Sequence, residues 1–395
     1  MNSISCDPVT VETADDAPGS FGVPLDTRQH GQATLAQRLK RVHEALRNHD
    51  GLAPLQRIAI ATYDSSTDTI KTFADSTIGT NPLGHYEVPL ARLGSLSQAA
   101  RTRVIRVVDV MTDGGSDAPA HVRELYRCGL RSSLTVPIYD HGRLFGFVFF
   151  NAAEPAFFRG AVADRLSPYM QLIAVLAINQ FMTVRLVRAV AKTAQEVTRQ
   201  RDLETSTHLE RMSHYARAVA LEGAKDWALS DEFIEHLFWF SPLHDIGKVA
   251  VPDSLLLKPA KLTEAETREM QQHVAKGGQM VDAIVREFGM DQLPNIGMLH
   301  NIIAFHHENV DGSGYPARAA GDAIPIEGRI TAVADVFDAL TSDRPYKRKW
   351  SNEAALGYMR GMAGRKFDPA CIDMLGRRMT DVVEIQRRFE QDVDF

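Results

Sequence analysis

Histidine and aspartate side chains recur in the second half of the sequence, inside or beside apolar segments. His244 and Asp245 follow one of the most apolar stretches, and His306 and His307 lead into a glycine-rich turn. Asp335 lies within an apolar helical pattern, where a bare carboxylate would be destabilising. Because imidazoles and carboxylates are costly to bury without a partner, this clustering predicts a cation held between them.

The elements that must position these residues are predicted to be helices, which account for nearly all of the chain after residue 201. Thr263 and Glu266 form a capping-box pattern that opens a helix carrying His273. Gly277 and Gly278 are expected to break that helix.

Two further features accompany the histidines. Gly247 is expected to provide a turn directly after His244 and Asp245, near the end of a helix. Glu204 and His208 are four residues apart, so one helix face presents both side chains. Taken alone, such a pair is more typical of a solvated face.

Residues 33 to 180 combine one helix with several strands. One helical face is expected to carry Leu35, Leu39, Val42 and Leu46. Strands are predicted at residues 57–63, 70–73, 133–138 and 144–150, and the hairpin signal Y-D-H-G-R joins the last two. The segments G-L-R-S-S-L-T-V-P-I and G-R-L-F-G-F-V-F-F-N resemble a GAF domain. The resemblance implies an α/β (α+β) sensory domain, and such domains often bind small molecules in a pocket facing the sheet.

Four side chains of this part are candidates for a metal or haem contact: His85, His121, Cys128 and His141. A hairpin turn explains His141, and a small core residue explains Cys128. We therefore assign no ligand to the GAF-like domain.

The sequence predicts four segments. Residues 1–32 are rich in Asp, Thr, Gly and Pro without periodicity, which indicates a disordered leader. Residues 165–204 are predicted to form one long helix, of which 181–203 would link the GAF-like domain (33–180) to a helical domain (204–395). Thr183, Val190 and Val197 are seven residues apart, which is consistent with a short coiled-coil seam and a homodimer. A helix packed against its own domains is an equal alternative.

The composition narrows the class of protein. The 395 residues carry a net charge of −6, which leaves no basic footprint for a nucleic acid polymer but allows a local Lys/Arg cluster for a small anion. The three cysteines are far apart, so neither a disulfide framework nor a thiolate zinc site is indicated. The N-terminus lacks a signal-peptide pattern, and residues 172–190 are interrupted by polar side chains, so we expect a soluble cytoplasmic protein with no membrane partner.

The polar blocks also occur in a recognisable order. H-D-I-G-K, H-H-E-N-V-D-G-S-G-Y-P and V-A-D-V-F-D-A-L-T-S-D-R-P-Y-K together resemble the HD-GYP phosphodiesterases, a branch of the HD superfamily. The resemblance covers roughly residues 200–380 and implies an all-α domain that hydrolyses cyclic di-GMP, a bacterial second messenger, to linear pGpG or GMP. Ser206 stands where the family usually has glycine, and Val310 replaces an aromatic residue.

The resemblance also implies which residues bind metal. The family's ligand positions fall on His244, Asp245, His273, His306, His307 and Asp335, and those of a third ion fall on Glu204 and His208. Eight ligands exceed the needs of one ion, so two or three divalent transition-metal ions are implied, with Asp245 as the bridge. Imidazole and carboxylate donors without thiolate favour iron first and manganese second.

Catalytic and substrate contacts follow from the same resemblance. Bridged ions would lower the pKa of a shared water, and Lys248 would neutralise a phosphate oxygen or assist proton transfer. Tyr315, Arg344 and Lys347 would face the substrate, although a solvated loop is the alternative for the last two. Asp338 would orient a ligand imidazole or cap the following loop. A diguanylate cyclase domain that contacts the G-Y-P loop is an implied partner.

Three functions are therefore compared. The first is a cyclic di-GMP phosphodiesterase regulated by the GAF-like domain. The second is a cyclic-dinucleotide receptor or docking module with weak or no turnover, against which the complete ligand set argues. The third keeps the enzyme but changes its substrate to mixed cyclic GMP-AMP.

Overall fold

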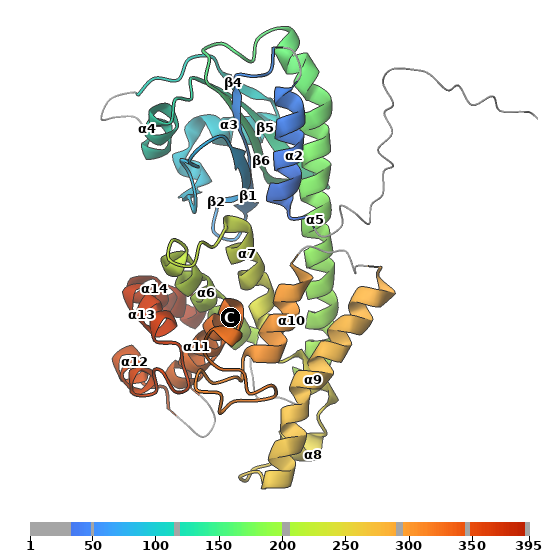
Figure 1. Ribbon diagram of the computed structural model, residues 1–395, viewed down its shortest axis with the longest axis vertical. Helices are drawn as coiled ribbons and strands as arrows, with labels where there is room; N and C mark the ends of the chain where they lie inside the picture. The colour runs from blue at the N-terminus through green and yellow to red at the C-terminus, as the bar shows by residue number, and fades with distance from the viewer. Residues whose placement is uncertain are drawn as a thin grey trace, which may run out of the picture.

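The computed structural model describes residues 33–48, 51–113, 119–199, 206–289, 295–343 and 348–391. A front part built on a sheet and an all-helical rear part lie one above the other, and one long helix runs along both (Figure 1). This arrangement confirms the predicted fold class. The expected leader, residues 1–32, lies outside the described residues.

The front part contains a six-stranded antiparallel sheet with the order β3-β2-β1-β6-β5-β4. Its strands are β1 (Leu55–Asp64), β2 (Thr69–Thr77), β3 (Glu87–Pro89), β4 (Arg106–Val108), β5 (Ser132–Asp140) and β6 (Arg143–Ala152). The four predicted strands are confirmed, and β3 and β4 were missed because three residues are too few to show periodicity. The β5–β6 hairpin turns through His141 and Gly142, which both have positive φ, as a two-residue turn requires.

Helices cover both faces of this sheet. On one face lie α2 (Leu35–Arg47) and the first half of α5 (Ala161–Arg199), packed against alternate residues such as Ile58 and Ile60. The other face carries α3 (Gly94–Thr102) and, toward β4, α4 (Ala120–Arg127). The predicted helical face of α2 is nearly right, except that His43 rather than Val42 is fully buried.

The long helix α5 contributes to two separate cores. Its buried residues in the front core are Leu166, Met170, Ile173, Ala177 and Phe181, and those in the rear core are Val184 and Val187. By length and composition alone, Ala161–Val190 could cross a membrane, contrary to the expectation from its polar interruptions. Core helices of soluble proteins pass the same test, and this helix has such a buried stripe.

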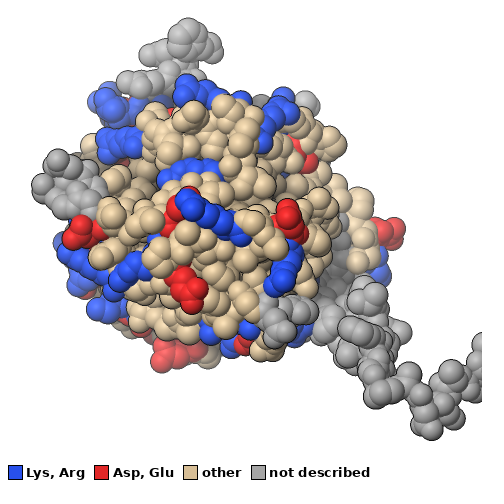
Figure 2. Space-filling model, turned by 90° about the horizontal axis from the view of Figure 1, so that it is seen from above, with Lys and Arg blue, Asp and Glu red and all other residues tan. Residues whose placement is uncertain are grey.

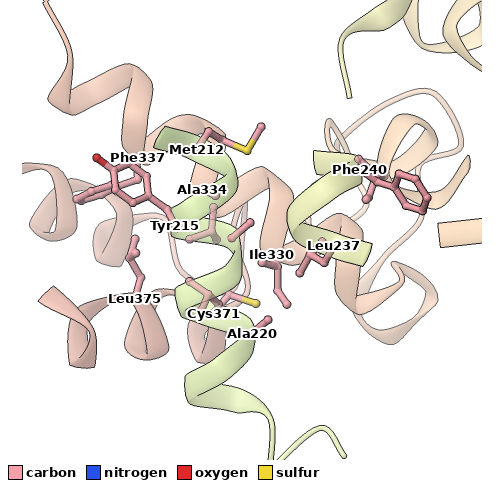
Figure 3. Packing of buried hydrophobic residues seen from close by; sticks show 14 of the residues in the cluster. Met212, Tyr215, Ala220, Leu237, Phe240, Ile330, Ala334, Phe337, Cys371 and Leu375 are labelled. Atoms are coloured by element: carbon pink, nitrogen blue, oxygen red, sulfur yellow. The ribbon is translucent and has the colours of Figure 1, made fainter. Parts of the chain in front are cut away.

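In the described residues of the rear part the regular elements are all helices, joined by loops that contain two isolated β-bridges. Its α-helices are α6 (Ser206–Gly223), α7 (Asp231–Phe240), α8 (Asp253–Leu256), α9 (Glu264–Glu287), α10 (Ile296–Phe305), α11 (Ile326–Thr341), α12 (Asn352–Gly361), α13 (Pro369–Arg377) and α14 (Met379–Gln391). Two short 3₁₀ segments, η3 (Ser241–Leu243) and η4 (Ile246–Ala250), follow α7. Figure 3 shows the core between α6 and its neighbours, where the rings of Tyr215 and Phe337 meet edge to face at 5.5 Å.

The predictions about glycines have different outcomes. The capping box of Thr263 and Glu266 is confirmed, but α9 continues through Gly277 and Gly278 to Glu287. A Cβ on Gly247 would lie 1.8 Å from the His273 carbonyl oxygen and 2.5 Å from the Gly277 nitrogen. Gly247 lies in the expected turn, which the Lys248 amide closes on the Asp245 carbonyl oxygen at 3.0 Å, and it also lets η4 lie directly against α9.

The front part docks on α7 and α6 through polar contacts. The Glu232 carboxylate accepts hydrogen bonds from the first two amides of α2, Leu35 (3.0 Å) and Ala36 (3.2 Å), and from Gln180 on α5 (2.7 Å). Three further pairs add to this contact: His85 with Asp231 (2.6 Å), Arg217 with Glu87 (2.8 Å), and Phe181 with Trp239 (ring centroids 4.8 Å). Glu232 is buried, and its carboxylate links α7, on which it lies, to α2 and α5.

The surface has no single sign of charge on the face seen in Figure 2. Lys and Arg side chains are interspersed there with Asp, Glu and uncharged residues. This pattern agrees with the net charge of −6 and gives a polyanion no continuous basic surface on that face.

Candidate metal centre

The candidate ligands come from five separate places in the rear part. His208 lies on α6, His273 on α9 and Asp335 on α11. His244 and Asp245 stand between η3 and η4, while His306 and His307 follow the last residue of α10. The structure therefore brings together residues that are up to 127 positions apart, from His208 to Asp335.

One group consists of Asp245, His273, His306 and His307. One potential ligand atom from each lies within 4.8 Å of the others. Asp245 Oδ1 is 3.1 Å from His273 Nε2 and 3.6 Å from His306 Nε2. The group is almost fully shielded from solvent, with His273 2% and His306 4% exposed.

The contacts of Nδ1 indicate which ring nitrogen of His273 and of His306 carries a proton. His273 Nδ1 lies 2.7 Å from the Met270 carbonyl oxygen, and His306 Nδ1 lies 2.9 Å from that of Ile303. A carbonyl oxygen only accepts hydrogen bonds, so Nδ1 carries a proton, and in the neutral ring Nε2 presents a lone pair.

These lone pairs face a carboxylate. His273 Nε2, His306 Nε2 and Asp245 Oδ1 are buried without a hydrogen-bond partner. Two acceptors at 3.1 Å repel each other unless a cation lies between them, and imidazole and carboxylate are common ligands of divalent transition metals. The donor set therefore fits a metal ion.

A second group lies on the other side of Asp245. Asp245 Oδ2 is 3.1 Å from His244 Nε2, whose ring is held by a 2.9 Å contact from Nδ1 to the Ser241 carbonyl oxygen. Asp335 Oδ1 lies 3.5 Å from His208 Nε2 and 3.9 Å from His244 Nε2. The two oxygens of Asp245 thus face different sets of imidazoles.

Asp338 orients His208. Its Oδ2 is 2.6 Å from His208 Nδ1, while Arg211 holds the same carboxylate through two hydrogen bonds of 2.7 and 2.8 Å. Ser342 donates a further hydrogen bond of 3.0 Å. Of the two roles considered for Asp338, this geometry favours orientation of a ligand imidazole.

The electrostatics favour a cation at both groups. Burial opposes ionisation of Asp245, but Lys248 and His244 outweigh it and hold the pKa of the carboxyl well below its usual range. Burial, reinforced by His306, lowers the pKa of His307 well below normal, which keeps that imidazole neutral and able to bind metal.

His208 behaves differently because it lies between two carboxylates. Burial would lower its pKa, but hydrogen bonds and charges from Asp335 and Asp338 raise it to about 10. Without a metal, a proton supplies the positive charge that this position attracts.

The predicted catalytic and substrate residues are only partly described. Lys248 Nζ lies 2.9 Å from Asp245 Oδ2, beside the second group. The Tyr315 ring stacks on His307 with a centroid distance of 4.7 Å, at the edge of the first group. Glu204, Arg344 and Lys347 lie outside the described residues.

Two supporting residues were missed in the sequence. Arg211 follows His208 by one helical turn, and that i,i+3 spacing was the available signal. Glu308 stands directly after the two histidines and accepts hydrogen bonds from the amides of Ala317 (2.6 Å) and Arg318 (3.0 Å). Glu308 thereby ties the G-Y-P loop to the end of α10, a role visible only in three dimensions.

A protein-family model matches the rear part of the chain. The HD domain family model matches residues 170–371. The cyclic di-GMP phosphodiesterase response regulator RpfG of Xanthomonas campestris pv. campestris is 47% identical over 189 residues, which cover 48% of this chain and 47% of the relative. A cyclic di-GMP phosphodiesterase of Vibrio cholerae is 39% identical over 199 residues, which cover 49% and 40% of the two chains.

A third relative has another substrate in its name. The 3'3'-cGAMP-specific phosphodiesterase 2 of Vibrio cholerae is 39% identical over 186 residues, which cover 47% of this chain and 34% of the relative. The chain thus spans about half or less of the length of these three curated relatives. The family model matches more than half of the sequence, and Asp245, His273, His306 and His307 of this chain converge as described. The chain therefore belongs to the HD domain family.

Proposed function

We propose that this chain is a metal-dependent phosphodiesterase that hydrolyses cyclic di-GMP to linear pGpG, to GMP or to both. The observation that carries the proposal is that the Nε2 atoms of His273 and His306 face the buried Oδ1 of Asp245 without a hydrogen-bond partner. The names of RpfG and the Vibrio cholerae relative support the choice of substrate.

The residues divide between two ions. Asp245, His273, His306 and His307 would hold one ion, and His208, His244 and Asp335 would hold another, with Asp245 bridging the two. A third ion would also need Glu204. We propose iron, with manganese as the alternative, because the proposed ligand set supplies imidazole and carboxylate and no thiolate.

The chain's own groups then position the substrate. When bound, bridged divalent ions would supply a water of lowered pKa and neutralise phosphate charge. The Lys248 ammonium, beside Asp245, would pair with a non-bridging phosphate oxygen or transfer a proton. Burial raises the pKa of Tyr315, so its hydroxyl stays protonated and would donate a hydrogen bond to the substrate. Arg344 and Lys347 would contact phosphate or guanine edges.

Mixed cyclic GMP-AMP is a second candidate substrate, because the relative specific for 3'3'-cGAMP matches over nearly the same length as the cyclic di-GMP enzymes. The ratio of kcat/KM for the two dinucleotides decides between them. A receptor without turnover is the third candidate and would show metal and nucleotide binding but no product.

The test combines metal content with turnover. Protein purified without air should contain two or three transition-metal ions per chain and convert cyclic di-GMP to pGpG or GMP on chromatography. Asp245→Asn should lose metal and at least about 100-fold in turnover, because one side chain serves both groups. The matched control is Asp226→Asn, an exposed position away from the centre, which should keep both. Wild-type turnover by Asp245→Asn, or protein that takes up no transition metal, would overturn the proposal.

We also propose that the front domain regulates turnover. The contacts of Glu232 and of the His85–Asp231 pair reach α7, which leads through η3 to His244 and Asp245. A change in the front sheet would therefore move the element that carries two ligands.

The remaining proposals concern partners. We propose a cytoplasmic homodimer formed through α5, whose exposed Leu172, Val175, Met182 and Leu186 form a stripe with heptad-like spacing. This stripe differs from the predicted seam: Thr183 and Val190 are half-buried, and the side chain of Val197 is outside the described set. A diguanylate cyclase domain at the G-Y-P loop remains a proposed partner.

A further inference from the structure

A cavity of about 400 Å³ lies in the front domain, between the sheet and helices α3 and α4. Its volume is in the range of small-molecule sites. Most of its wall is apolar, with contributions from Ala59, Leu96 and Phe149. The sequence suggested no ligand for this domain, so the wall itself must identify the ligand class.

A buried arginine lies at one end of the cavity. Arg57 on β1 faces Asn151 on β6, and Asn151 faces Ser133 on β5, so the three form one row across the sheet. Arg57 Nη1 donates to Asn151 Oδ1 at 3.2 Å, and Asn151 Nδ2 donates to Ser133 Oγ at 3.0 Å. All three side chains line the cavity.

Arg57 makes no ion pair within the described part of the chain. Arg57 is 2% exposed, its Nε has no hydrogen-bond partner, and no described carboxylate lies within 4.0 Å of it. Burial lowers the pKa of Arg57 to about 10, although the charges of Asp75 and Asp231 act in the opposite direction. A buried cation with one neutral partner is costly, and an anion in the cavity would remove that cost.

The other charged residues of the wall have the same sign. Arg106 is half-buried and Arg92 is exposed. His121 also lines the cavity, with the Tyr86 hydroxyl 3.0 Å from its Nδ1. None of the described lining residues is an aspartate or a glutamate. Burial and the nearby Arg106 lower the pKa of His121, as expected in a positive environment.

We propose that this cavity binds a small organic anion with an apolar body, whose acidic group pairs with Arg57 and Arg106. The apolar wall would take the body, and Asn151 and Ser133 would fix the orientation of the acidic group. A cation would meet the like charges of Arg57 and Arg106, and an uncharged ligand would leave Arg57 without a direct ion pair.

The test uses a matched pair of fluorescent probes on the full chain. The anionic probe is 8-anilinonaphthalene-1-sulfonate, and the neutral probe is N-phenyl-1-naphthylamine, the same molecule without its sulfonate. Arg57→Gln and Arg106→Gln should each weaken binding of the anionic probe at least tenfold and change binding of the neutral probe less than threefold. Arg101→Gln on α3, exposed and outside the cavity wall, is the control and should change neither.

Folding and binding are separated in this design. Circular dichroism and thermal melting show whether each variant is folded, and Arg106 is the safer site because it is only half-buried. A folded Arg106→Gln protein that binds the anionic probe as wild type does, or that loses both probes equally, would overturn the proposal. Neither readout depends on phosphodiesterase activity, so this inference can fail while the proposed enzyme stands.

Discussion

Asp245 faces side chains on both sides of the candidate metal centre. One oxygen faces His273 and His306, and the other faces His244 and Lys248. Because a carboxylate has two oxygens pointing in different directions, a single residue can belong to both groups. The sequence identified Asp245 as the bridge only through family resemblance, and the distances now give a geometric reason for it.

At the same scale, Asp338 should control the affinity of the second group for metal. Asp338→Asn keeps the shape but removes the charge that orients His208 and holds Arg211. We expect metal affinity and turnover to fall by about 10- to 100-fold, as for other residues that support a metal ligand. Metal titration and product chromatography measure both effects. Equal loss in the exposed control Asp226→Asn would show a nonspecific cause.

At the scale of elements, the contact between η4 and α9 depends on glycine. Gly247→Ala would place a methyl group 1.8 Å from the His273 carbonyl oxygen, so the two elements must separate. We expect the free energy of unfolding to fall by about 1–3 kcal/mol. Urea denaturation followed by circular dichroism provides the measurement.

Another glycine, Gly278 on α9, serves as the control for this experiment. A Cβ on Gly278 would meet nothing within 4 Å, so Gly278→Ala should stabilise the helix by about 0.5–1 kcal/mol. Opposite signs at the two positions are expected. Equal and small effects would show that the close approach does not matter.

A histidine on α6 should make stability depend on pH. Burial lowers the pKa of His214 to about 4, with help from Arg388 and Lys71, and its ring contacts Phe238. The unfolded chain therefore binds a proton near pH 6.5 that the folded chain accepts only near pH 4, so stability falls as pH drops through this window.

The substitution His214→Phe tests this effect. Between pH 6.5 and pH 4, the free energy of unfolding should fall by up to about 2 kcal/mol more in the wild type than in the variant. This figure allows for the partial exposure of His214. Urea denaturation at pH 7 and at pH 4.5 compares the two proteins. His141→Gln, in an exposed hairpin turn, controls for removal of one histidine, and identical pH slopes in all three proteins would refute the assignment.

For the whole molecule, Glu232 joins the front domain to the rear one. The first amides of a helix have no partner within the helix, and Glu232 supplies one to Leu35 and Ala36 of α2. Glu232→Ala should lower the free energy of local unfolding at the start of α2 by about 1–2 kcal/mol. Amide exchange at Leu35 and Ala36 should therefore become about 5- to 30-fold faster.

Hydrogen exchange resolved at α2 measures this change. Glu264→Ala, at an exposed position on α9, is the control and should leave α2 unchanged. Unaltered exchange at Leu35 in Glu232→Ala would mean that the docking contact does not hold the two domains together.

The sequence by itself determined the fold class, the four long strands, the capping box of α9 and the positions on which a metal centre would be built. The strands and the capping box depend on local periodicity and on residue type, which a single sequence displays directly, whereas the fold class and the metal positions followed from resemblance to known families. Gly277 and Gly278 were misjudged from the sequence, because a glycine that permits close packing, such as Gly277, looks the same as one that ends a helix.

Only the tertiary structure decided which residues meet. The contact of Arg211 with Asp338, the docking of Glu232 on α2 and the row of Arg57, Asn151 and Ser133 in the cavity join distant parts of the chain. Such contacts depend on how helices and strands pack, and neither periodicity nor composition encodes a distance between elements. The ligand class proposed for the front domain was hidden for the same reason, since Arg57 becomes informative only when its burial and its lack of a direct ion pair are seen.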